Sequence, residues 1–302
     1  MKVEALRNER IKDFVDYCKK HRMEVDDSFL CDEDLKDFKP NDENPTFIVT
    51  DQTGELIASA SLIIDDYNRR GRKARFRIFH SETEDIKCYE MMMSSILKFT
   101  GGLDKVYVFV PEANKKLMEF IEALRFIVER YSFVLVRENL EVPEIGLPMD
   151  YEIRSFKLER DEETWCQVRN AGFAKLQGSE TPLTPEIVVK MISAGDHIEG
   201  GSMILYHKNR PVGVVRGTKE EYEGSPIMNI GPLAIIPEYQ AKGLGRCLLR
   251  ASLHFAKETA YTRSILCVNA DNNRAKALYL QEGFKQVEAV VCYKYDLITN
   301  KL

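Results

Sequence analysis

Hydrophobic positions in the C-terminal half of the chain alternate between strand and helix periodicity. The apolar stretch from Met228 to Ile236 predicts a strand. After a short polar loop, leucines recur at helical spacing over residues 248–253, so a helix is expected to follow. A second strand is predicted over 264–268 and a second helix over 273–282. The alternation indicates an α+β (α/β) fold, in which helices flank a mixed central sheet.

The loop between the first strand and its helix contains Gln240, Gly243 and Gly245 in the order Gln-x-x-Gly-x-Gly. This spacing fits neither the Walker A loop nor the GxGxxG dinucleotide fingerprint. Backbone N–H groups at a helix N-terminus favour a bound anion, and a residue without Cβ lets the anion approach closely. The pattern predicts a pyrophosphate site, and an ordinary tight strand-to-helix turn is the alternative.

The second helix begins after a polar turn that contains Asn272, and it ends before Gly283. Glycine suits the left-handed residue that follows a helix. The segment before that glycine places Val268 first, Asn272 four residues later and Tyr279 seven residues after that. Together with the Gln240–Gly245 loop upstream, this motif closely resembles the GNAT superfamily of acyl-CoA-dependent N-acyltransferases.

The resemblance implies that two central parallel strands separate and that acetyl-CoA, the co-substrate, lies between them. Backbone groups of Leu233, Ala234 and Ile235 would then bind the pantetheine arm, and the Ile235 N–H would hold the oxyanion. Asn272 would fix the pantetheine arm, and Tyr279 would be the general acid for the departing thiolate. The implied pyrophosphate contacts are Gln240, Ala241, Lys242, Gly243, Leu244, Gly245 and Arg246.

Each implied role has a structural alternative. Leu233 and Ile235 are strand core residues whatever the function. Lys242 fits a solvated loop, and Asn272 fits a helix cap. Tyr279 fits a packed aromatic residue, although a phenol with a pKa near 10 readily protonates a thiolate.

The N-terminal half contains a second copy of this pattern. Val110 aligns with Val268, and the same offset of 158 residues aligns Asn114 with Asn272 without a gap. A predicted hairpin over 46–62 matches one over 203–217. The chain is therefore expected to hold two tandem GNAT folds.

The N-terminal copy lacks the chemistry of its counterpart. Ile121 stands where the other copy has Tyr279, and Glu82–Lys87 replaces the glycine loop with three carboxylates and no glycine. Because carboxylates repel a pyrophosphate, this copy is predicted not to bind CoA. The arrangement is similar to mycothiol-synthase-like two-domain GNAT proteins.

Prolines and a glycine interrupt both periodicities between the copies. We therefore expect a degenerate GNAT-like domain at 1–143 and a catalytic N-acetyltransferase domain at 150–302.

Composition and charge limit the classes of partner that are expected. The net charge of −5 disfavours nucleic acid, and no apolar run is long enough to suggest a membrane partner. The seven Cys form no CxxC motif and indicate reduced thiols in a cytoplasm. With five scattered His, no metal site is expected. A helix start at Cys247 suggests a lowered thiol pKa.

The implied reaction is direct attack of an acceptor amine on the thioester of acetyl-CoA. The acceptor is a small-molecule or peptide amine, and no pattern assigns its identity or an oligomeric state. The first strand carries Asn229 and no carboxylate, so Glu220, Glu221 and Glu223 in the preceding turn are the candidate bases. The alternative function is a catalytically silent acyl-CoA-binding sensor or interaction protein.

Overall fold

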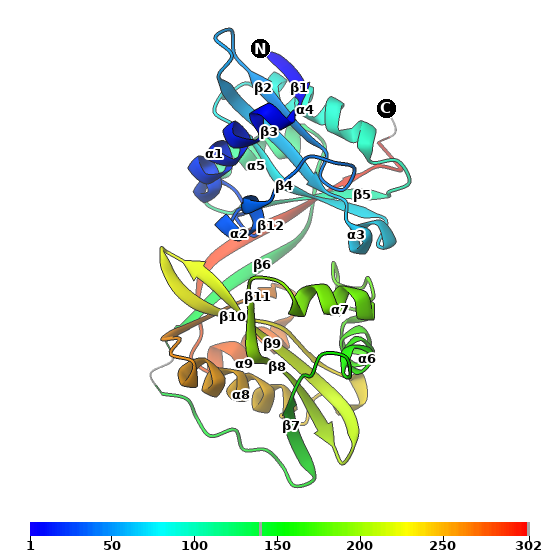
Figure 1. Ribbon diagram of the computed structural model, residues 1–302, viewed down its shortest axis with the longest axis vertical. Helices are drawn as coiled ribbons and strands as arrows, with labels where there is room; N and C mark the ends of the chain where they lie inside the picture. The colour runs from blue at the N-terminus through cyan, green and yellow to red at the C-terminus, as the bar shows by residue number, and fades with distance from the viewer. Residues whose placement is uncertain (139–140, 301–302) are drawn as a thin grey trace. The chain divides into compact units, whose positions relative to one another are not determined.

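The computed structural model describes residues 1–138 and 141–300, which form two compact units (Figure 1). The N-terminal unit comprises Met1–Ser132 and Glu288–Leu302, and the C-terminal unit comprises Phe133–Val287. Each unit has its own apolar core. Among the described residues, no helix combines the length and apolar character that crossing a bilayer requires.

The N-terminal unit has a mixed sheet in the order β1-β2-β3-β4-β5-β12. Its strands are β1 (Lys2–Ala5), β2 (Thr46–Thr50), β3 (Leu56–Ile63), β4 (Lys73–Ser81), β5 (Lys105–Pro111) and β12 (Lys285–Asp296). Its helices are η1 (Asn8–Arg10), α1 (Ile11–His21), η2 (Arg22–Glu24), α2 (Asp32–Lys36), α3 (Asp66–Arg70), α4 (Ile86–Ile96), η3 (Leu97–Phe99) and α5 (Lys115–Ala123). Strands β4 and β5 are parallel, whereas β12 pairs antiparallel with β5.

The C-terminal unit has a mixed sheet in the order β6-β11-β10-β9-β8-β7. Its strands are β6 (Ile127–Glu138), β7 (Tyr151–Ser155), β8 (His197–His207), β9 (Arg210–Tyr222), β10 (Ser225–Ile235) and β11 (Arg263–Asn269). Its helices are α6 (Glu162–Phe173), α7 (Pro185–Ile192), η4 (Pro237–Tyr239), α8 (Leu244–Glu258) and α9 (Asn273–Gln281). The predicted strands and helices of this half are confirmed, with ends that differ by a few residues.

Helices α6 and α8 pack on opposite faces of β10. A Cβ at Gly172 of α6 would lie 3.0 Å from the Cβ of Ala234. On the other face, a Cβ at Gly213 would lie 2.6 Å from Ile235 and 2.8 Å from Leu248 of α8. Because successive side chains of a strand point to opposite faces, these contacts place β10 between the two helices.

Equivalent strands and helices of the two copies also lie 158 residues apart. Strands β5 and β11, helices α5 and α9, and strands β6 and β12 begin and end at equivalent positions. Asn114 has φ −87° and ψ 71°, and Asn272 has φ −82° and ψ 61°. Arg125 keeps the left-handed conformation of Gly283, with φ 68° against 89°. The two copies therefore share backbone geometry where their residues differ.

The compact units divide the chain differently from the predicted limits 1–143 and 150–302. Strand β6 ends the first copy but is the neighbour of β11, and β12 ends the second copy but pairs with β5. The last strand of each copy thus completes the sheet of the other unit. A linker rich in proline marks the sequence boundary but carries no information about such an exchange.

Candidate functional site

Strands β10 and β11 separate soon after they pair. Their parallel ladder contains the pairs Met228–Ser264 and Asn229–Ile265. Strand β10 continues to Ile235 with β9 on its other side. The edge of β10 that faces β11 is therefore open over its C-terminal half, in the described part of the chain.

Backbone groups of Leu233 and Ile235 point to this open edge. The N–H of Ile236 donates to the carbonyl oxygen of Val212 on β9 at 3.0 Å. Because hydrogen-bonding direction alternates along an antiparallel strand, the N–H and C=O groups of Leu233 and Ile235 point away from β9. The Gln240 side chain confirms the direction, since its amide donates to the Ile235 carbonyl oxygen at 2.9 Å.

The loop after β10 presents unpaired amides. Ala241 and Gly243 adopt left-handed conformations, with φ 65° and 80°. Gly243 is the N-cap of α8 and offers no side chain to the helix. No described residue accepts a hydrogen bond from the backbone N–H groups of residues 241–245. Five successive donors at a helix N-terminus are a suitable site for an anion.

Gly245 faces the space beside the open edge. A Cβ there would lie 3.8 Å from both Leu233 of β10 and Leu278 of α9. The protein itself leaves room for a methyl group, so packing does not require glycine at this position. A larger side chain would extend between β10 and α9.

The two cations of the loop have partners within the unit. The Lys242 ammonium lies 4.5 Å from the centre of the Tyr239 ring. Arg246 donates to the Gln281 side chain and lies 3.3 Å from the Glu282 carboxylate. Backbone amides are therefore better placed than these side chains to bind a phosphate.

Several of the other candidate residues have roles in the fold. The predicted cap at Asn272 is confirmed, because its side chain accepts from the Ala275 N–H at 3.2 Å. A contact of Asn272 with pantetheine stays a prediction. Leu244 is buried in the core. Burial raises the pKa of Cys247, so the lowered pKa expected from its helix position is wrong.

Tyr279 lies on α9 with 9% of its surface exposed. Its ring packs edge-to-face against Phe284 at 6.0 Å. Burial, with a smaller contribution from Cys267, raises the pKa of the phenol to about 12. Among the described residues nothing hydrogen-bonds to the hydroxyl, which is therefore available as a proton donor at neutral pH.

The candidate bases differ in their surroundings. The Asn229 side chain on β10 donates to the Glu220 carboxylate on β9 at 2.5 Å. Glu223 pairs with Arg263 at 3.2 Å. Strand β9 therefore brings the Glu220 carboxylate to β10, the strand that lacks a carboxylate of its own. The prediction that all three acidic residues lie in one turn is wrong for Glu220 and Glu221, because β9 extends through them to Tyr222.

The equivalent helix start in the N-terminal unit binds part of its own amides. Asp85 occupies the position of Gly243, and its carboxylate accepts from the Lys87 N–H at 3.0 Å. The N–H of Thr83 donates to the Ser81 hydroxyl at 3.1 Å. Side chains of this segment thus accept from two of the amides whose counterparts in the C-terminal unit are free donors.

The space between β4 and β5 is also occupied by the protein. Their parallel pairing ends at Arg75, and residues 24–29 lie against both strands beyond it. Asn114 donates to the first carbonyl oxygen of this segment at 2.7 Å, and Arg77 donates to its last at 2.9 Å. Arg75 pairs with the carboxylate of Asp26.

The model of the Acetyltransferase (GNAT) family matches residues 167–284. This segment therefore has the sequence pattern of a GNAT acetyltransferase domain. The match contains β10, α8, β11 and α9, which are the elements that build the open edge and the amide loop.

The sequence relatives of the chain include two mycothiol acetyltransferases. The protein of Renibacterium salmoninarum is 27% identical over 165 residues, which cover 53% of this chain and 48% of the relative. The protein of an Arthrobacter species is 26% identical over 187 residues, which cover 57% of each chain. The chain thus matches about half the length of these curated relatives.

Solved structures resemble the chain over nearly its whole length. A GCN5-related N-acetyltransferase from Sphaerobacter thermophilus has a TM-score of 0.75 at 15% identity and covers 98% of this chain and 95% of its own. A tandem GNAT protein from the clavulanic acid biosynthesis pathway has a TM-score of 0.71 at 12% identity and covers 98% of both. These likenesses confirm the expected tandem GNAT fold.

Proposed function

We propose that the C-terminal GNAT domain is an N-acetyltransferase that moves the acetyl group of acetyl-CoA to an acceptor amine. The observation that carries this proposal is the open edge of β10 beside the five free amides of residues 241–245. The pyrophosphate binds the amides, and the pantetheine arm pairs with the backbone of Leu233 and Ile235 as an added strand would.

The reaction is a direct transfer. The deprotonated amine attacks the thioester carbonyl, and the oxyanion accepts a hydrogen bond from the Ile235 N–H. The carbon–sulfur bond then breaks, and the thiolate takes the proton of the Tyr279 hydroxyl. The extra proton on the attacking nitrogen passes through water to the phenolate, which leaves a neutral amide and restores the phenol. The Gln240 side chain donates to the Ile235 carbonyl oxygen, which belongs to the next peptide group, and so holds the strand directly after this N–H.

Glu220 is the base that we favour for the acceptor ammonium, acting through a water molecule. It is the carboxylate that contacts β10 through Asn229. Glu223 is less suited because Arg263 already pairs with its carboxylate.

The acceptor that we favour is a small-molecule amine, because the relatives with matching sequence are mycothiol acetyltransferases. A peptide amine is the alternative. The N-terminal unit is proposed not to bind CoA, since Asp85 caps its helix and residues 24–29 lie along its open strand edge.

The test combines binding with turnover. Calorimetric titration with acetyl-CoA should give one site per chain, and a panel of aminosugars, amino acids and peptides should include an amine that releases CoA thiol. One site without turnover on any amine would favour the silent acyl-CoA-binding protein. Two sites would contradict the proposal for the N-terminal unit, and no binding would contradict the function.

A further inference from the structure

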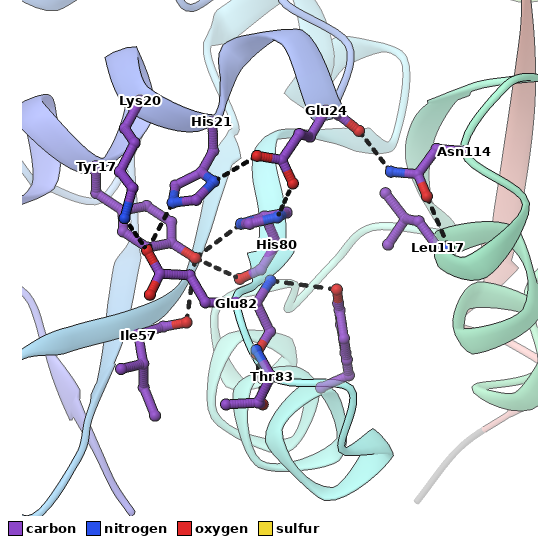
Figure 2. Close-up of polar contacts among 12 residues, drawn as sticks. Tyr17, Lys20, His21, Glu24, Ile57, His80, Glu82, Thr83, Asn114 and Leu117 are labelled. Atoms are coloured by element: carbon purple, nitrogen blue, oxygen red, sulfur yellow. Dashed lines mark hydrogen bonds and ion pairs between the residues drawn. The ribbon is translucent and has the colours of Figure 1, made fainter.

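The N-terminal unit contains a cluster of two buried histidines and an exposed glutamate (Figure 2). His21 is the last residue of α1, Glu24 ends η2, and His80 lies near the end of β4. The two imidazoles are 6% and 4% exposed and stack with ring centres 4.4 Å apart. One ligand atom from each residue lies within 4.8 Å of the other two.

The Glu24 carboxylate bridges the two rings. One oxygen lies 2.8 Å from His21 Nδ1, and the other lies 3.2 Å from His80 Nε2. A zinc ion holds such atoms at about 2.0–2.2 Å, so ligands at tetrahedral corners lie roughly 3.4 Å from each other. Each of these nitrogens is therefore about as far from a Glu24 oxygen as one ion would require, and the three ligand atoms lie within 4.8 Å of one another.

The outer nitrogen of each ring has its own partner. His21 Nε2 lies 2.7 Å from the Glu82 carboxylate, and Lys20 also binds that carboxylate at 2.7 Å. His80 Nδ1 lies 2.7 Å from the Tyr17 hydroxyl. Metal-binding histidines commonly donate their second N–H to a carboxylate or another oxygen, which fixes the tautomer and the ring orientation.

The Tyr17 hydroxyl supports the same tautomer at His80. It lies 3.2 Å from the carbonyl oxygen of Ile57, which only accepts. When the hydroxyl proton goes to that carbonyl, the hydroxyl accepts from His80 Nδ1–H. This tautomer frees the His80 Nε2 lone pair for an ion, and donation from His21 Nε2–H to Glu82 does the same for His21 Nδ1. Without an ion, Glu24 accepts from N–H groups at these positions, so ion binding releases protons.

We propose that His21, Glu24 and His80 bind one divalent transition-metal ion of the zinc class, with Glu82 and Tyr17 as the outer partners. Two imidazole nitrogens and a carboxylate oxygen are a common ligand set for this class. The Glu24 side chain is half exposed, so water completes the coordination. The ion joins η2 to β4 and thereby holds residues 24–29 along the open edge of β4.

The site was not expected from the sequence, because His21 and His80 are far apart in the chain and show no ligand spacing. The proposal does not depend on acetyl transfer, since all of its residues lie in the N-terminal unit.

The experiment is titration of chelator-treated full-length protein with ZnCl₂, followed by Co²⁺ as a spectroscopic probe. We expect one equivalent of Zn²⁺ and the visible absorption of tetrahedral Co²⁺ without a thiolate charge-transfer band. Glu24→Gln and His21→Ala should each weaken binding at least tenfold. Glu82→Gln should weaken it roughly 10–100-fold, as outer-partner substitutions do.

Two control variants should bind Zn²⁺ as the wild type does. Glu119→Gln removes an exposed carboxylate of the same unit. His254→Ala removes an imidazole of the other unit, which contacts the carbonyl oxygen of Pro143. Glu24→Gln keeps the size of a half-exposed side chain, so it tests the site even if His21→Ala fails to fold. Absence of Zn²⁺ binding, wild-type affinity in Glu24→Gln, or a thiolate band would overturn the proposal.

Discussion

The two units build the same strand, loop and helix, and they differ in what occupies the edge of the strand. In the C-terminal unit, Leu233 and Ile235 leave that edge open. At the equivalent positions of the N-terminal unit, Arg75 and Arg77 hold residues 24–29 against the strand. The same fold therefore has an open strand edge in one copy and a self-filled edge in the other, as expected when function depends on side chains grafted on a fold.

The backbone has changed less than the chemistry. Arg125 keeps the left-handed conformation of Gly283, although a non-glycine residue there is strained. Asn114 caps its helix as Asn272 does, with acceptor distances of 3.1 and 3.2 Å. The N-terminal unit thus has no glycine loop and yet keeps the turn that follows the second helix.

The largest expected difference between the copies is catalytic. Tyr279→Phe should lower kcat roughly 10²–10⁴-fold, because the thiolate loses its proton donor. The acetyl-CoA dissociation constant and the midpoint of thermal unfolding should change little, since the ring and its packing on Phe284 remain. Steady-state kinetics beside calorimetry separates the two effects, and an unchanged kcat would remove Tyr279 from the mechanism.

Binding of acetyl-CoA should depend on one copy only. Gly245→Glu should abolish it, because the side chain extends between Leu233 and Leu278 and places a negative charge beside the free amides. Lys87→Glu makes the same charge at the equivalent, exposed position of the N-terminal unit and is the matched control. Calorimetry should show loss of the site in the first variant and one normal site in the second.

The sequence predicted the elements of the site better than its contacts. Periodicity and local motifs located β10, α8 and α9, because those signals lie within a few residues of one another. The Gln240–Ile235 bond and the pairing of Arg246 with Glu282 depend on side-chain directions that a pattern does not contain. The sequence therefore could not show that these two side chains have partners within the protein.

The sequence did not predict contacts between segments that are far apart in the chain. Residues 24–29 have no motif that places them beside β4, and the exchange of β6 and β12 leaves no trace in composition. The sequence predicts from the missing glycines that the N-terminal copy does not bind CoA. Its self-filled strand edge is a second, independent reason that only the structure reveals.

The two capping asparagines should have similar effects on stability and different effects on substrate. Asn114→Ala and Asn272→Ala should each lower the free energy of unfolding by about 1 kcal/mol. Asn114→Ala should lower it further, since its side chain also donates to the Glu24 carbonyl oxygen. If Asn272 contacts pantetheine, its variant alone should raise KM for acetyl-CoA. If the two variants have equal KM values for acetyl-CoA at the same folded fraction, Asn272 acts only as a helix cap.

The smallest expected effect concerns the pH profile of kcat/KM. Ionisation of Tyr279, the proposed acid, should not lower it at alkaline pH. A phenol with its pKa raised to about 12 by burial keeps its proton at every pH where the protein is assayed. The profile of kcat/KM should therefore rise as the acceptor amine and the base lose protons, and it should not fall between pH 8 and about 10 through ionisation of Tyr279. A fall near pH 10 that disappears in Tyr279→Phe would show that the phenol ionises at its ordinary pKa and that the surroundings of the hydroxyl are wetter than its 9% exposure indicates.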